Sequence, residues 1–99
     1  MAFIGSTTPL VGSDVFTSVA KVDGFTKIRG IVHSDESGSL VISHSADGVN
    51  WDVAETAITV TGGTGEAIDF TLLGSYFKIV YTNGATDQGE FRLWVKSYG

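Results

Sequence analysis

Residues 90–96 read EFRLWVK, with Phe, Leu and Val on one side of the alternation and Glu, Arg, Trp and Lys on the other. Residues 27–33, 39–43 and 67–72 alternate in the same way. A period of two places successive side chains on opposite faces of a β-strand. Residues 76–81 are apolar on both faces except for Lys78, which is typical of a central strand. We therefore predict antiparallel sheets packed around one core.

Glycine-containing turn signals separate these runs at short intervals. They fall at 23–24, 35–38, 47–48, 62–65 and 83–84. This spacing predicts an all-β, jelly-roll-like sandwich of about seven or eight short strands over residues 15–99. The last two strands are expected to form a hairpin with a long connection, residues 83–89.

The first 14 residues lack this repeating pattern. They contain the single proline, Pro9, and the apolar residues Phe3, Ile4, Leu10 and Val11. An isolated tail gains nothing from apolar side chains that stay in water, so we expect residues 1–14 to form an extended arm ordered against a partner. The alternative is a first edge strand folded onto its own sandwich.

Composition narrows the classes of function. The 99 residues suit one domain, and 42% of them are hydrophobic, enough for a core. The net charge of −5 and the scattered Lys and Arg residues argue against binding to nucleic acid or to an anionic membrane. The absence of cysteine excludes disulfides and thiol catalysis. A charged fraction of only 17% suggests that another protein covers part of the surface. Residues 1–5 lack the features of a signal peptide, so synthesis in a cytosol is expected.

The sharpest local motif is SADGVNW at residues 45–51. We interpret Ser45, Asp47 and Gly48 as a structural turn in which the carboxylate accepts backbone N–H groups, and we expect Trp51 to enter the core. A calcium site would instead use Asp47, Asn50 and Asp52, but the spacing fits no complete calcium loop.

No constellation predicts catalysis. His33, Asp35, Glu36 and His44 form too sparse a set for zinc and are expected to be solvated residues at a strand end. No serine stands in a Gly-x-Ser-x-Gly motif, and no phosphate-binding loop is present. We expect no catalytic, cofactor-binding or metal-binding residues, and we expect the protein not to be an enzyme.

Trp94 is the main candidate for binding. If residues 91, 93 and 95 face the core, Trp94 faces outward beside Arg92 and Lys96, a combination enriched in protein contact surfaces. The indole is also suited to stacking on a sugar ring. The alternative is that the N-terminal segment or a loop of the same chain covers it.

Three stretches carry a resemblance to a known group. Residues 39–51 resemble the L-x-I-x-x-S-x-D-G-x-N-W strand–turn–strand of discoidin-like jelly rolls. Residues 74–84, followed by Phe-Arg-Leu at 91–93, are similar to the closing strands of that group. With Thr-Pro-Leu at 8–10, the same order resembles small β-sandwich proteins encoded among the structural genes of tailed bacteriophages.

The resemblance implies a structural protein of the virion, most simply a capsid decoration protein on the outer head shell. Its partners would be the major capsid protein, further copies of itself in a homo-oligomer, or both. Partner contacts are expected from Arg92 and Trp94 and from five residues of the arm, namely Phe3, Ile4, Pro9, Leu10 and Val11. A carbohydrate-binding or receptor-binding module of a tail fibre is the competing interpretation, with Trp94, Tyr76 and Tyr98 as its aromatic residues.

Overall fold

The computed structural model describes residues 3–22 and 24–98, and within these residues every regular element is a β-strand. The strands are β1 (Phe3–Ser6), β2 (Val15–Lys21), β3 (Lys27–Ser34), β4 (Gly38–Ser45), β5 (Val53–Ala54), β6 (Ile58–Val60), β7 (Thr64–Thr71), β8 (Tyr76–Asn83) and β9 (Phe91–Tyr98). This part of the chain contains no helix that is long and apolar enough to cross a membrane. The prediction of an all-β sandwich is confirmed, and the described residues form nine strands where about seven or eight were expected.

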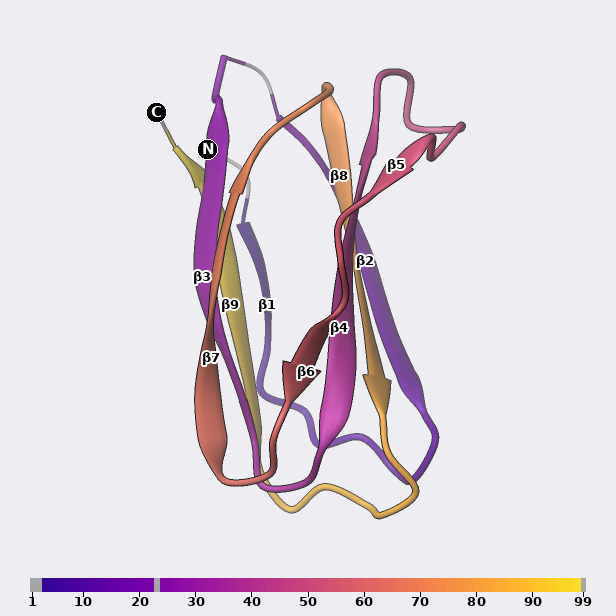
Figure 1. Cartoon of the computed structure of the whole chain (residues 1–99), viewed down its shortest axis with the longest axis vertical. Helices are drawn as coiled ribbons and strands as arrows, with labels where there is room; N and C mark the ends of the chain where they lie inside the picture. Colours follow the sequence, from indigo (N-terminus) through magenta and orange to yellow (C-terminus); the bar gives the residue numbers. More distant parts are fainter. Residues whose placement is uncertain (1–2, 23, 99) are drawn as a thin grey trace.

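The strands form two antiparallel sheets that face each other (Figure 1). One sheet has four strands in the order β1-β9-β3-β7. The other has the order β2-β8-β4-β5, and β6 also pairs with β4. Strand β8 lies between β2 and β4, which is the central position that its doubly apolar sequence predicts.

The core lies between the two sheets, where the inward side chains of the alternating strands meet. The four-stranded sheet contributes Ile4, Ile28, Val32, Ile68, Phe91, Leu93 and Val95. The five-stranded sheet contributes Leu40, Ile42, Val60, Phe77, Ile79 and Tyr81. The rings of Tyr81 and Phe91 pack 4.9 Å apart across the interface. Burial of these apolar side chains is the main stabilising contribution to the fold.

The predicted hairpin of the last two strands is wrong, because β8 and β9 belong to different sheets. Both hydrogen-bonding edges of β8 are already taken, one by β2 and the other by β4. Strand β9 therefore has no free edge of β8 to pair with. It crosses to the other sheet and lies between β1 and β3.

The N-terminal segment is part of the sandwich, so the second alternative holds and an extended arm is not observed for the described residues. Strand β1 pairs with β9, and Ile4 is only 4% exposed. The Leu10 N–H donates to Gln88 Oε1 (2.8 Å), and the Gln88 N–H donates back to the Leu10 carbonyl (2.8 Å). Residues 1 and 2 lie outside the described residues.

Replacing Asn83 tests how strongly the segment is held. The buried Asn83 Nδ2 group donates to the carbonyls of Leu10 (3.2 Å), Val11 (2.9 Å) and Thr86 (2.9 Å). Asn83→Ala removes the donor from all three, and we expect a loss of about 1–3 kcal/mol in unfolding free energy. Urea denaturation measures this. The exposed neighbour Thr82→Ala is the control, and equal stability of the two variants would contradict the assignment.

Candidate functional site

The most exposed aromatic surface lies on the outer face of the four-stranded sheet. Trp94 on β9 is directly opposite Ile31 on β3 and Gly5 on β1. Phe3 packs edge-on against Trp94, with ring centroids 5.5 Å apart. Trp94 is 59% exposed, Ile31 63% and Phe3 57%. We call this surface the Trp94 face, and it comprises Phe3, Arg29, Ile31, Arg92, Trp94 and Lys96.

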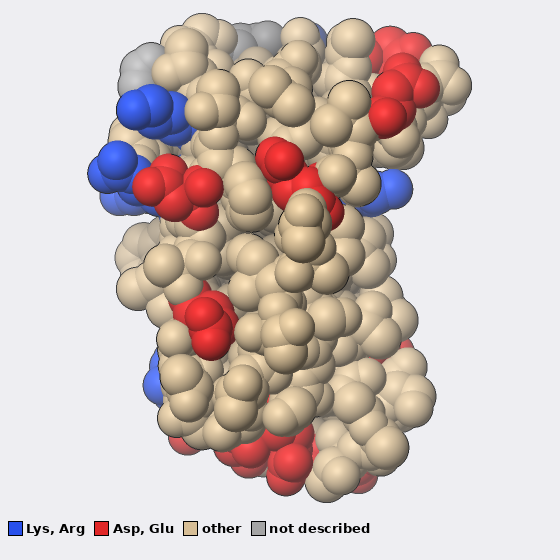
Figure 2. Space-filling view, in the orientation of Figure 1, with Lys and Arg blue, Asp and Glu red and all other residues tan. Residues whose placement is uncertain are grey.

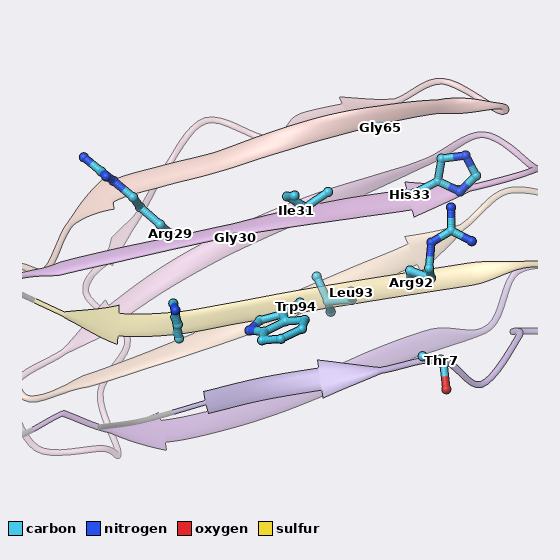
Figure 3. Close-up of a pocket in the computed structure, with 10 residues that line it drawn as sticks. Thr7, Arg29, Gly30, Ile31, His33, Gly65, Arg92, Leu93 and Trp94 are labelled. Atoms are coloured by element: carbon cyan, nitrogen blue, oxygen red, sulfur yellow. The ribbon is translucent and has the colours of Figure 1, made fainter.

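Trp94 forms a ridge between two shallow hollows. The larger has a volume of about 620 Å³ and extends over β3 and β9, with Arg29 at one end and His33 and Arg92 at the other (Figure 3). The smaller, about 450 Å³, lies between Trp94 and β1 and includes Phe3 and Gly5. A projecting indole flanked by two depressions can interlock with a complementary surface.

Basic residues concentrate on this side of an acidic protein. Four of the six Lys and Arg side chains project from it, namely Lys27, Arg29, Arg92 and Lys96. Arg29 Nε lies 3.6 Å from Asp69 Oδ1, and its guanidinium lies over the Tyr98 ring at 4.8 Å. Arg92 pairs with Glu90. In Figure 2 most of the blue surface follows the edge formed by this sheet, whereas red surface is spread over the whole view, including a cluster at the lower end.

A glycine beneath this surface lets β3 and β9 lie close together. A Cβ at Gly30 would clash with the Trp94 carbonyl oxygen and would lie 2.8 Å from Val95 Cα. Gly30 therefore helps to fix the position of the β9 backbone that carries Trp94.

The structure separates the predicted partner-binding residues. Phe3, Arg92 and Trp94 come together on the Trp94 face. Ile4 belongs to the core and the half-buried Leu10 packs against it, so neither lies on the Trp94 face, and their role as contact residues stays a prediction. Pro9 and Val11 are exposed in the segment that leads to β2.

Two residues of this surface, Ile31 and Arg29, and the adjoining Gly5 do not stand out in the sequence alone. Ile31 is an apolar residue in the polar half of the β3 alternation, and this irregularity is its one local signal. Arg29 lies opposite Lys96, and Gly5 lies opposite Trp94, because strands from distant segments of the chain pair in this register.

Asp47 organises the turn after β4. Its Oδ1 atom accepts the N–H groups of Val49 (2.8 Å) and Asn50 (2.8 Å), and Ser45 Oγ donates to the same oxygen (3.0 Å). Asn50 Nδ2 donates to Oδ2 (2.8 Å). The backbone N–H bonds hold the pKa of Asp47 well below its usual range. Both carboxylate oxygens thus accept bonds within the turn, and Gly48 supplies the required positive φ of 80°.

The expectation that Trp51 enters the core is wrong. Trp51 is half-buried, and its ring centroid lies 4.7 Å from Lys78 Nζ. Lys78 projects outward from β8 because its neighbours Phe77 and Ile79 point into the core. Trp51 therefore covers the outer surface of the five-stranded sheet.

The two histidines belong to different sheets. His33 lies on the outer side of β3, with Nδ1 3.6 Å from Glu90 Oε1. His44 is buried on β4, with Nε2 3.3 Å from Glu55 Oε2. Within residues 3–22 and 24–98, no three His, Cys, Asp or Glu side chains are placed to hold a metal ion.

The fold and the exposed face define the chain as a small antiparallel β-sandwich domain with an aromatic, basic outer surface. It belongs to the family described as "Uncharacterised protein YqxG N-terminal domain", whose model matches residues 1–98. The likeness to discoidin-like jelly rolls stays a prediction.

Two similar proteins place the domain in longer chains. The chain is 32% identical over 69 residues to "Uncharacterized protein YqxG" of Bacillus subtilis (strain 168), a match that covers 70% of this chain and 23% of that protein. The crystal structure of the PBSX exported protein XepA shares the fold, with a TM-score of 0.86 and 21% identity over 99% of this chain and 37% of XepA. The chain thus spans well under half of either relative.

The Asp47 turn gives a pH-dependent prediction. A carboxyl with a lowered folded-state pKa stabilises the fold fully above its unfolded pKa, about 3.9, and this contribution is lost as the pH falls toward the folded value. We expect Asp47→Ala to melt below the wild type at pH 7 and 5, with a difference that shrinks below about pH 4. Calorimetry at these pH values measures it. Asp52→Ala removes a nearby carboxylate that does not accept these N–H groups, and a difference for Asp47→Ala that stays constant to pH 2.5 would contradict the prediction.

Proposed function

We propose that this domain is a non-enzymatic structural component of a phage particle that binds another protein through the Trp94 face. In its most specific form, the proposal is a capsid decoration domain on the outer surface of the head shell, with the major capsid protein as its partner. Further copies of the chain on the particle are a second class of partner. A domain that binds only the assembled shell lowers the free energy of that shell by mass action.

The observation that carries this proposal is the exposed cluster of Phe3, Ile31 and Trp94. Each of the three side chains is more than half exposed, and they adjoin on one sheet face. Contiguous exposed apolar patches mark interaction sites in soluble proteins. Trp and Arg are the residues most often found to dominate binding energy at protein interfaces, and both occur here.

The similar proteins are consistent with this proposal. XepA is an exported protein of the phage PBSX, and it contains the same fold within a chain almost three times as long. A role in a phage particle or outside the host cell would suit a domain that presents one adhesive surface. The length of both relatives leaves room for further domains beside this one.

A carbohydrate-binding module is the second candidate, supported by the Trp94 ridge and its adjoining hollow. Tyr98 projects from the same strand, but Tyr76 lies in the other sheet, so the three predicted aromatic residues do not form one platform. Glycan-array binding that Trp94→Thr abolishes would favour this candidate over protein binding.

Truncation of the indole tests the proposal directly. The binding assay is co-sedimentation with phage heads that lack this protein, prepared from the phage that encodes it. We expect Trp94→Thr to weaken this binding at least about tenfold, as for a central interface residue. The melting temperature should change little, because the side chain is exposed and threonine suits a strand. Val19→Thr replaces an exposed apolar residue of the other sheet and should bind as the wild type does. Undiminished binding by Trp94→Thr would overturn the proposed interface.

A further inference from the structure

Two like charges lie directly opposite each other beside Trp94. Arg29 on β3 and Lys96 on β9 are cross-strand partners, and both project from the outer face. Like charges in this position destabilise an antiparallel pair. Arg29 is partly compensated by Asp69, whereas no carboxylate among the described residues pairs with Lys96.

A second polar row lies on the other side of the indole. Arg92 is opposite His33, and Ile31 with Trp94 forms the row between. Neighbouring rows on one face are two residues apart, so the outer rows are separated by about 13 Å. Figure 3 shows Arg29 at one end of the hollow and His33 with Arg92 at the other, with Ile31 and Trp94 between them. Along the strands, the face therefore presents the cationic pair Arg29–Lys96, then the apolar pair Ile31–Trp94, then Arg92 with His33, which the Glu90 carboxylate partly neutralises.

We propose that the Trp94 face binds an acidic protein surface, in which carboxylates flank an apolar pocket that receives Trp94. This inference rests on the proposed docking function and specifies the chemistry of the partner. A carboxylate near Lys96 and Arg29 would relieve their repulsion only in the complex. Four cations lie on one face of a chain whose net charge is −5. An acidic partner surface is complementary to this local positive charge.

The same charges argue against one simple assembly. A symmetric dimer through this face would bring the face of one copy against its own equivalent. Arg29, Arg92 and Lys96 of both copies would then crowd into one interface, where like-charge contacts are costly. These charges therefore favour a complementary surface that differs from the Trp94 face itself.

Charge reversal at Lys96 separates the effect on folding from the effect on binding. Glu at position 96 would face Arg29 and convert a repulsive cross-strand pair into an attractive one. We expect Lys96→Glu to raise the melting temperature of the free domain by about 2–5 °C. We expect the same variant to bind phage heads that lack this protein at least about tenfold more weakly than the wild type does, measured by co-sedimentation. A purely structural role for Lys96 would not shift the two measurements in opposite directions.

The experiment measures co-sedimentation with heads that lack this protein, at NaCl concentrations between 50 and 500 mM. It compares the wild type with Lys96→Glu, Trp94→Thr and Lys21→Glu. Lys21→Glu makes the same change in net charge on the other sheet and should bind with wild-type affinity. Wild-type binding should weaken as salt rises, because the complementary charges are screened.

The outcomes distinguish the two proposals. If Trp94→Thr loses binding while Lys96→Glu retains it, the acidic partner is overturned and the docking function stands. If the wild type does not bind heads, or if Trp94→Thr binds as well as the wild type, the docking proposal fails and the inference fails with it. Calorimetry with polygalacturonate tests an anionic glycan. If this polymer binds the wild type but not Lys96→Glu, the partner is an anionic glycan and the proposed acidic protein is overturned.

Discussion

The crossing from β8 to β9 is the constraint on which the arrangement of the other strands depends. Strand β8 has no free edge, so the chain must leave its sheet before β9 can find partners. Gln88 holds this crossing to Leu10 through reciprocal hydrogen bonds, and its Nε2 donates to Ser34 Oγ (2.9 Å). Asp35 also accepts the Gly89 and Glu90 N–H groups at 3.0 and 3.1 Å. These bonds satisfy backbone groups where the chain passes between the sheets, so the crossing keeps one path.

The crossing also creates the candidate site. It delivers β9 into the gap between β1 and β3, which brings Phe3, Ile31 and Trp94 together from three strands far apart in the sequence. The N-terminal strand thus contributes to both surfaces of its sheet, with Ile4 in the core and Phe3 outside. The N-terminal segment, which the sequence predicts to be a separate binding arm, instead contributes Phe3 to the Trp94 face.

The sequence patterns that succeed are local ones. Alternation along each strand identifies the inward residues and places Trp94 outside, because side-chain direction in a strand follows from position alone. Pairing between strands is not a local property, so the patterns predict a hairpin that the occupied edges of β8 forbid. Trp51 is misplaced for a similar reason, since its environment depends on where Lys78 projects from a strand of a distant segment. The opposition of Arg29 and Lys96 likewise appears only once β3 and β9 are in register.

Gly30 connects the interior of the sandwich to the Trp94 face. Any side chain at this position would press on the β9 backbone at Trp94 and Val95, on the strand that carries the indole. The domain is therefore free to vary its surface charges one at a time, but not the spacing of the two strands that carry them. Residues around Trp94 can therefore change without moving the two strands, whereas a change at Gly30 alters the spacing of every side chain that they carry outward.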